Sequence, residues 1–89
     1  MVSQKVIVIN KHGFHLKPAG AFCTEAMKYQ SKVTFQIGTT NANAKSVLGV
    51  LAAGVKEGDE IEIQCDGIDE ELALTNLVNL VSQGFGLEE

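Results

Sequence analysis

The pattern of apolar and polar residues predicts four β-strands along the chain, two of them from strict alternation. A run of four β-branched residues at positions 6–9 indicates a first strand over residues 2–9. Apolar and polar residues alternate within residues 31–38 and again within residues 57–65, so each segment is expected to form a strand with one face in water. A shorter strand is expected near residues 40–42.

Two further segments have helical periodicity. In residues 18–29 apolar residues recur every three or four positions. Proline is accepted in a first helical turn, so this helix is expected to begin just after His15 or Leu16. The apolar residues 47–54 follow Ser46, a good helix cap, and end at a glycine, which predicts a short second helix.

A final helix is expected after Asp69, which is placed as its N-cap. Its apolar residues form a broad stripe at helical spacing, Gly84 and Gly86 end it, and residues 87–89 are expected to be a loose tail. The stripe consists of Leu72, Ala73, Leu74, Leu77, Val78, Leu80 and Val81.

The resulting element order is β-α-β-β-α-β-α, without repeats, low-complexity segments or linkers. Strands with one polar face favour an antiparallel sheet with helices on its other face, so the predicted fold class is α+β. The 89 residues, of which 45% are hydrophobic, have room for one modest core. Residues 1–89 are therefore expected to form a single domain.

Charge and composition narrow the possible classes of protein. The net charge of −4 and the pI near 5.0 argue against a general nucleic-acid binder, although a local basic spot can still hold an acidic ligand. The start of the chain lacks a signal-peptide pattern, and no segment approaches the roughly 20 apolar residues of a membrane span. We therefore expect a soluble, cytoplasmic protein. Cys23 and Cys65 could form one disulfide, but both lie on apolar stripes, which favours two buried, reduced thiols.

The segment HGFHLKPAG, residues 12–20, contains both histidines and the only proline of the chain. His15 falls where a loop meets a helix start, whose free N–H groups stabilise an anion. With Lys17 nearby, its imidazole is suited to carry a phosphoryl group, although the pattern alone favours a histidine without chemistry. His12 and His15 also form H-x-x-H, a weak metal signal because zinc needs three or four ligands.

A second group of candidate residues begins at Ser46. Its hydroxyl is sufficient as a helix cap, and a phosphoserine there would also be stabilised by the helix dipole. Val47, Leu48, Val50 and Leu51 cannot all face inward on a short helix, so some are expected to be exposed. Exposed apolar residues of this kind either mark a docking surface or have no role.

These two segments resemble a known family. GFHLKPAG, residues 13–20, is similar to the active-site segment of HPr, the histidine-containing phosphocarrier of the bacterial phosphoenolpyruvate-dependent sugar phosphotransferase system. NAKSVLGVLAAGVKEGDEIEI, residues 43–63, is similar to the regulatory-serine segment of that family. The resemblance runs from about residue 2 to residue 86. It implies an open-faced β-sandwich, with a four-stranded antiparallel sheet and three helices on one face, and a phosphocarrier without a cofactor rather than an enzyme.

The resemblance also implies a role for the first segment. His15 would be phosphorylated on Nδ1 by enzyme I, which takes its phosphate from phosphoenolpyruvate, and would pass the phosphate to IIA domains of sugar permeases. The N–H groups near Leu16 and Lys17 would hold the phosphate.

For the second segment, the resemblance implies regulation and docking. Ser46 matches the serine that HPr kinase/phosphorylase modifies in Firmicutes-type bacteria, where the modified protein is a corepressor with the catabolite control protein. Val47, Leu48 and Leu51 would form part of the surface on which the partners dock.

The chain departs from the family pattern at several positions of the first segment. Lys17 stands in place of the usual arginine and lacks its planar, bidentate fork. Leu16 replaces alanine, and Gly20 replaces threonine or alanine. His12 replaces a small polar residue and would be either a second cation near the phosphate or an unproductive acceptor.

Other classes of protein stay open on the residues alone. One is a regulatory binding protein that acts mainly through Ser46, although relatives specialised in this way lack the active histidine. Another is an unrelated α+β interaction module, and a metal-binding protein is a more distant alternative. The sugars served are decided by the permeases and cannot be read from this chain.

Overall fold

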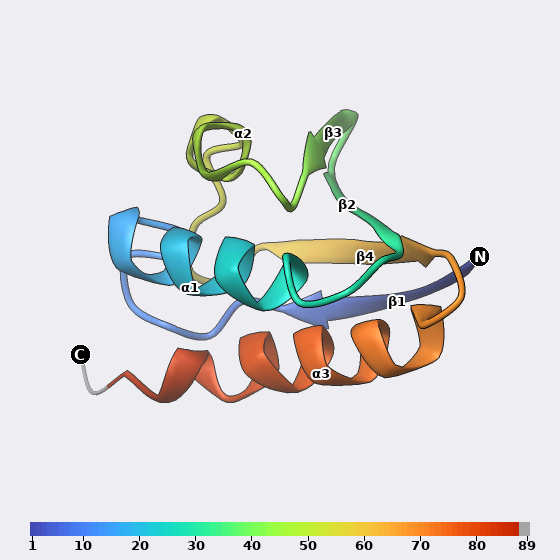
Figure 1. Ribbon diagram of the computed structural model, residues 1–89. Helices are drawn as coiled ribbons and strands as arrows, with labels where there is room; N and C mark the ends of the chain where they lie inside the picture. The colour runs from blue at the N-terminus through green and yellow to red at the C-terminus, as the bar shows by residue number, and fades with distance from the viewer. Residues whose placement is uncertain (88–89) are drawn as a thin grey trace.

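Four strands and three α-helices follow one another in the part of the chain that the structure describes, residues 1–87 of the computed structural model. The expected order is confirmed, and a short 3-10 helix, η1, is added near the end. The elements are β1 (Val2–Ile7), α1 (Leu16–Ala26), β2 (Lys32–Ile37), β3 (Thr40–Asn43), α2 (Val47–Ala52), β4 (Glu60–Asp66), α3 (Glu70–Ser82) and η1 (Gly84–Gly86) (Figure 1).

The four strands form one antiparallel sheet in the order β1-β4-β2-β3. In the two central strands, Phe35 lies opposite Ile63, and both side chains are buried. The residues between the buried positions are polar, and Thr34 Oγ1 donates to Gln64 Oε1 at 3.2 Å across the same two strands. The alternation in the sequence therefore separates a buried face from a polar face, as predicted.

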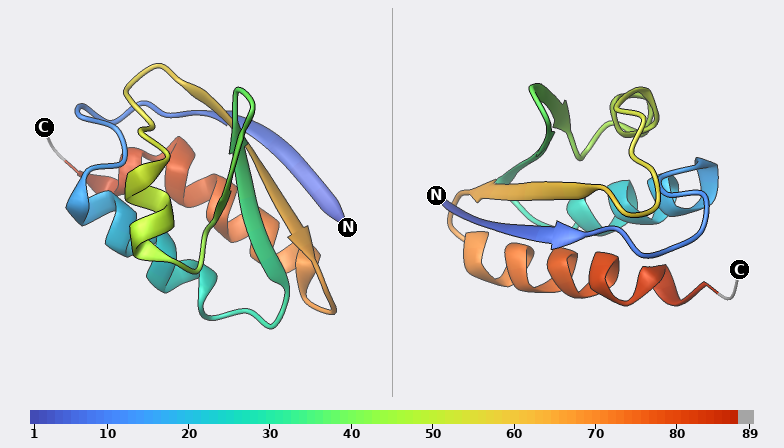
Figure 2. Two further views of the ribbon diagram at one scale, coloured as in Figure 1. Left: turned by 90° about the horizontal axis from the view of Figure 1, so that it is seen from above. Right: turned by 180° about the vertical axis from the view of Figure 1, so that it is seen from behind.

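The helices lie on one face of the sheet, which makes the fold an open-faced β-sandwich (Figures 1 and 2). Helix α3 packs along β1 and β4, α1 packs against α2 and α3, and α2 adjoins β3. The α+β class and the arrangement expected from the family resemblance are both confirmed.

An aromatic cluster ties the β1–α1 loop to the rest of the core. The ring of Phe14 lies 5.3 Å from Phe22 of α1, 5.8 Å from Phe35 of β2 and 5.6 Å from Phe85 of η1, measured between centroids. Separations of this size are typical of favourable aromatic pairs. Phe14, the residue directly before His15, is therefore held by ring contacts to α1, β2 and η1 at once.

Several element boundaries differ from the prediction: β4 begins at Glu60 rather than at residue 57 and ends at Asp66 rather than at residue 65, and α2 ends at Ala52 rather than at residue 54. Strand β1 ends at Ile7 rather than at residue 9, because Val8 turns out of the ladder. Its N–H donates to the Asp59 carbonyl at 2.9 Å, and its carbonyl accepts from Gly58 at 2.7 Å. Helix α1 ends at Ala26, and a turn with a hydrogen bond from the Tyr29 N–H to the Ala26 carbonyl follows it.

The expected cap of the last helix is wrong in its chemistry. Asp69 occupies the N-cap position of α3, but its side chain makes no capping hydrogen bond. Its carboxylate instead accepts from the N–H groups of Gln30 and Ser31, each at 2.9 Å, and from the Ser31 hydroxyl. These bonds, the one from the hydroxyl first, hold the pKa of Asp69 below its ordinary value.

Three smaller expectations about α3, the tail and the thiols can be compared with the structure. Leu72 is exposed, so the apolar stripe of α3 is narrower than predicted. Both thiols are free; Cys65 is buried, which raises its pKa to about 11, whereas Cys23 is only half-buried. The expected tail, apart from Leu87, lies outside the described residues.

Candidate functional site

His15 occupies the N-cap position of α1, as the sequence predicted. Its backbone is extended, with φ −74° and ψ −175°, and its carbonyl accepts the first helical hydrogen bond from the Ala19 N–H at 2.9 Å. The imidazole makes no capping hydrogen bond to the helix. Pro18, the third helical residue, has no N–H to offer. Within residues 1–87 the N–H groups of Leu16 and Lys17 have no protein acceptor, so both are available to an anion.

A tight turn shapes the loop that leads to His15. The Gly13 N–H donates to the Asn10 carbonyl at 3.1 Å, and Asn10 Nδ2 donates to the Gly13 carbonyl at 2.6 Å. Sequence patterns did not single out Asn10, although asparagine first and glycine fourth is a common turn pattern. Asn10 therefore stabilises this loop by hydrogen bonds to Gly13 from both its backbone and its side chain.

Gly13 lets the same loop lie directly on the chain that follows α2. Its φ is +57°, and a Cβ at this position would lie 2.3 Å from the Val55 carbonyl oxygen. That oxygen accepts a hydrogen bond from the Phe14 N–H at 3.0 Å. Only glycine allows both the left-handed backbone and the close approach.

His12 is brought next to His15 by this loop. The two ring centroids are 5.9 Å apart, and the ring planes meet at 81°. His12 is exposed and has a φ of 69°, a left-handed conformation that side chains disfavour. Residue spacing alone does not indicate this conformation, because the conformation depends on the two hydrogen bonds between Asn10 and Gly13.

Leu16 and Lys17 lie at the exposed end of α1. Leu16 is 70% exposed, and the Lys17 side chain is also exposed to solvent. An ammonium group on a flexible stem is a mobile point charge. The N–H groups fixed by the helix and this mobile cation together suit an anion with several oxygens.

Ser46 caps α2, which confirms that prediction. Its Oγ accepts from the Gly49 N–H at 3.1 Å, and its carbonyl accepts from the Val50 N–H at 2.9 Å. The side chain is half-buried. The hydroxyl therefore already has a structural task at this helix start.

The apolar residues of α2 divide between the core and the surface, as expected. Val50 is fully buried and Leu51 is half-buried, whereas Val47 is 36% exposed and Leu48 is 76% exposed. Helices α1 and α2 pack together, so exposed leucines occur at the starts of two neighbouring helices.

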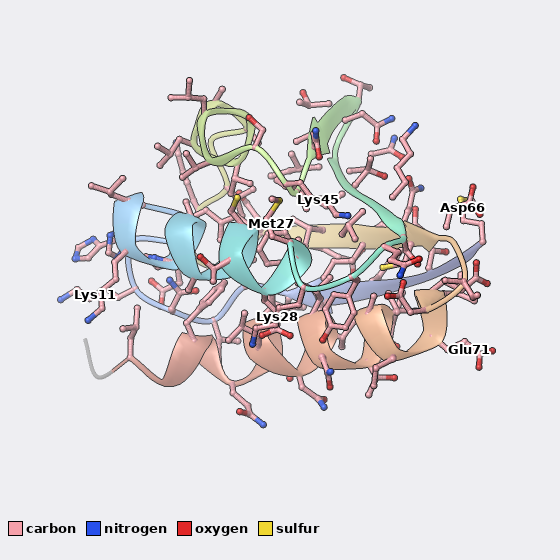
Figure 3. All side chains as sticks on the ribbon, in the orientation of Figure 1. Lys11, Met27, Lys28, Lys45, Asp66 and Glu71 are labelled. Atoms are coloured by element: carbon pink, nitrogen blue, oxygen red, sulfur yellow. The ribbon has the colours of Figure 1, made fainter. Side chains whose placement is uncertain are left out.

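The charged residues are unevenly distributed along the molecule. Lys11 lies at the end where α1 begins, whereas Asp66 and Glu71 lie at the opposite end (Figure 3). Lys11 and Lys17 flank His15 in sequence. A chain of net charge −4 thus has a basic spot beside His15.

Neither a metal cluster nor a membrane-spanning helix is found in the described residues. Within residues 1–87, no group of three or more His, Cys, Asp and Glu side chains is placed to hold a metal ion. The pair of His12 and His15 supplies two nitrogen ligands, fewer than zinc sites use. No helix in the same part of the chain is long and apolar enough to cross a membrane.

Comparison with known proteins identifies the family. A family model described as the PTS HPr component phosphorylation site matches residues 2–83. The phosphocarrier protein HPr of Treponema pallidum is 35% identical over 85 residues, which covers 96% of this chain and 97% of the relative. The HPr-like protein Crh of Bacillus subtilis is 36% identical over 83 residues, covering 93% and 98%. The crystal structure of HPr-C-His from Thermoanaerobacter tengcongensis has a TM-score of 0.96 at 34% identity and covers both chains completely.

The fold, the family model and the curated relatives define a small phosphocarrier protein rather than an enzyme. More specifically, the chain belongs to the HPr family of the phosphotransferase system. The resemblance drawn from the two sequence segments is thereby confirmed.

Proposed function

We propose that the protein accepts a phosphoryl group from enzyme I on Nδ1 of His15 and passes it to IIA domains of sugar permeases. The observation that carries this proposal is the position of His15 beside the Leu16 and Lys17 N–H groups, which have no protein acceptor within residues 1–87. Family membership supplies the kind of partner.

In the transfer step the bond between phosphorus and enzyme I breaks as a bond between phosphorus and a nitrogen of His15 forms. The lone pair of the His15 nitrogen attacks the phosphorus carried by enzyme I, and the electron pair of the breaking bond returns to the donor. The phosphoryl oxygens then accept from the Leu16 and Lys17 N–H groups, and the Lys17 ammonium offsets their charge. Transfer to a IIA domain repeats the exchange with the phosphocarrier as donor.

Val47, Leu48 and Leu51 are proposed to contact these partners. Their support is the exposure of Leu48 and Val47 on a helix that packs against α1. Apolar surface of this kind gains free energy when a partner covers it.

Ser46 is proposed as a regulatory phosphorylation site for HPr kinase/phosphorylase, with the catabolite control protein as the partner of the modified form. The relative Crh of B. subtilis is a catabolite repression HPr. Phosphate oxygens on Ser46 could take over the capping bond from Gly49 at the helix start. We further propose that residues 1–89 act as one cytoplasmic domain.

Phosphate uptake tests the proposal directly. Wild type and His15→Ala are incubated with enzyme I, Mg²⁺ and phosphoenolpyruvate and read by intact mass at neutral pH, then after brief acid treatment. An acid-labile phosphate on wild type alone is expected, since N–P bonds of phosphohistidine hydrolyse in acid. In a parallel reaction with HPr kinase and ATP, an acid-stable phosphate is expected on wild type and not on Ser46→Ala. Uptake by His15→Ala would place the acceptor elsewhere.

A further inference from the structure

His12 holds an unusual backbone conformation at the edge of the His15 site. Apart from Phe85, it is the only non-glycine residue of residues 1–87 with a positive φ. Side chains rarely adopt this conformation, and residues that do so cluster at functional sites. The bonds between Asn10 and Gly13, which flank His12, hold it there.

The conformation has a consequence for the position of the imidazole. It brings the His12 ring to 5.9 Å from the His15 ring, with the planes nearly perpendicular. A phosphoryl group bound to a ring nitrogen of His15 extends outward from that ring, and the His12 ring is its neighbour. A protonated imidazole offers two N–H donors and one positive charge.

From this placement we propose that His12 is a positioning residue for the phosphoryl group on His15: its imidazolium donates a hydrogen bond to a phosphoryl oxygen and offsets its charge. The proposal rests on the proposed phosphorylation of His15. It assigns His12 the first of its two alternatives, a second cation, and not a second acceptor. The Leu16 and Lys17 N–H groups and the Lys17 ammonium do not exhaust the lone pairs of three phosphoryl oxygens, so a further donor can be accepted.

The charged neighbours of His12 make this interaction dependent on the phosphate. Lys11 precedes it, and His15 and Lys17 follow within the same segment. The chain between α2 and β4, which contacts Gly13, brings Lys56 and Glu57 to the same end of the site. Among the described residues these groups are mostly positive, and a phosphoryl dianion on His15 would make a positive charge on His12 favourable. Because the proposed donor is the protonated imidazole, the contribution of His12 is expected to be larger at lower pH.

A competition for phosphate measures this contribution. Equal amounts of wild type and His12→Asn are mixed with a catalytic amount of enzyme I and limiting phosphoenolpyruvate, and the phosphate on each is read by intact mass after equilibration. Asparagine tolerates the left-handed backbone and carries no charge. Because enzyme I only catalyses the exchange, differences in docking do not affect the final distribution.

At about pH 6 we expect wild type to hold roughly two- to fivefold more phosphate than His12→Asn, as for an exposed charge interaction. The ratio should fall toward one when the competition is repeated at about pH 8, because the proposed donor is the protonated imidazole. His12→Lys should retain the advantage at both pH values, because its charge does not titrate in this range. The control Lys32→Gln removes one charge at the far end of the sheet, where Lys32 lies opposite Asp66 in the register of β2 and β4, and should share phosphate equally with wild type.

The outcomes separate this proposal from the one on which it rests. Normal uptake on His15 with equal sharing at pH 6, or enrichment in His12→Asn, overturns the role of His12 and leaves the carrier function intact. Phosphate found on His12 itself also overturns it. If wild type, incubated without a competing variant, takes up no phosphate, both proposals fail.

Discussion

The starts of α1 and α2 solve the same problem in opposite ways. Every helix start presents N–H groups without intrahelical acceptors. At α2 the hydroxyl of the N-cap residue Ser46 accepts from the third N–H, that of Gly49, while the first two N–H groups have no protein acceptor within residues 1–87. At α1 the N-cap is His15, whose side chain makes no such bond, and Pro18 removes one further donor. The third N–H of α2 is therefore bonded within the protein, whereas α1 has no N–H at that position, and within residues 1–87 its first two N–H groups are left for an anion.

Packing explains why α1 tolerates an open start. It has 11 residues and buries Pro18, Ala19, Phe22 and Ala26. Helix α2 has six residues and buries only Val50, so packing contributes less and the cap contributes relatively more. Helix α1, which packing against the core already stabilises, can therefore begin without a side-chain cap and leave N–H groups for an anion.

The largest expected effect comes from a substitution at Gly13, which should displace the loop that leads to His15 and the start of α1. In Gly13→Ala the new Cβ would lie 2.3 Å from the Val55 carbonyl oxygen with φ at +57°. Strain and overpacking together should lower the free energy of unfolding by about 2–4 kcal/mol and slow phosphate uptake on His15. Urea denaturation gives the first quantity, and uptake is measured where the variant is still folded.

Gly20→Ala is the matched control for this prediction. Gly20 lies within α1, and no atom lies within 4 Å of the place that a Cβ would take, so alanine should stabilise the protein by up to about 1 kcal/mol. Equal destabilisation by both variants would show that the contact between Gly13 and Val55 has no special importance.

A smaller loss of stability is expected when the capping hydrogen bond at the start of α2 is removed. Ser46→Ala removes the acceptor of the Gly49 N–H and should cost about 1 kcal/mol of stability, whereas Ser46→Asn should recover most of it. Hydrogen exchange resolved by residue sharpens the comparison: the Gly49 amide should exchange faster in Ser46→Ala, while the Leu16 and Lys17 amides exchange rapidly in both proteins. Slow exchange at Leu16 and Lys17 in wild type would contradict an open start.

The smallest effect concerns the start of α3, where the carboxylate of Asp69 serves another segment. Its pKa lies below the ordinary value of 3.8, so its stabilisation is present above that pH and is lost as pH falls through the lowered pKa. Asp69→Asn should lack this part of the acid-induced loss of stability, whereas Glu71→Gln, in the same helical turn, should retain it. Thermal unfolding between about pH 5 and pH 2 gives the comparison. Identical profiles for wild type and Asp69→Asn would refute the assignment.

Local chemistry made much of the fold and site predictable. The start of α1, the capping bond of Ser46 and the one-sided strands depend on residues within one turn or one pleat. Both family motifs lie in continuous segments, so His15 and Ser46 could be singled out without the fold.

Tertiary contacts explain what the sequence could not show. Asp69 looked like a cap because aspartate favours that position, but the chain at Gln30 and Ser31 takes its carboxylate. The apolar run in β1 continued to residue 9, yet Val8 bonds to Gly58 and Asp59 outside the ladder. The proximity of His12 to His15 follows from a positive φ that no residue pattern indicates.

The His15 site combines two kinds of donor. Because Pro18 has no N–H, the backbone donors are those of Leu16 and Lys17, and the other donors are side chains that substitution can change. The Leu16 and Lys17 N–H groups belong to the backbone, and any substitution except proline preserves them. Mutation can therefore adjust this site gradually only through side chains such as those at positions 12 and 17. A lineage can replace both without dismantling the backbone donors, and this chain, with His12 and Lys17, has unusual residues at these two positions for the pattern it otherwise resembles.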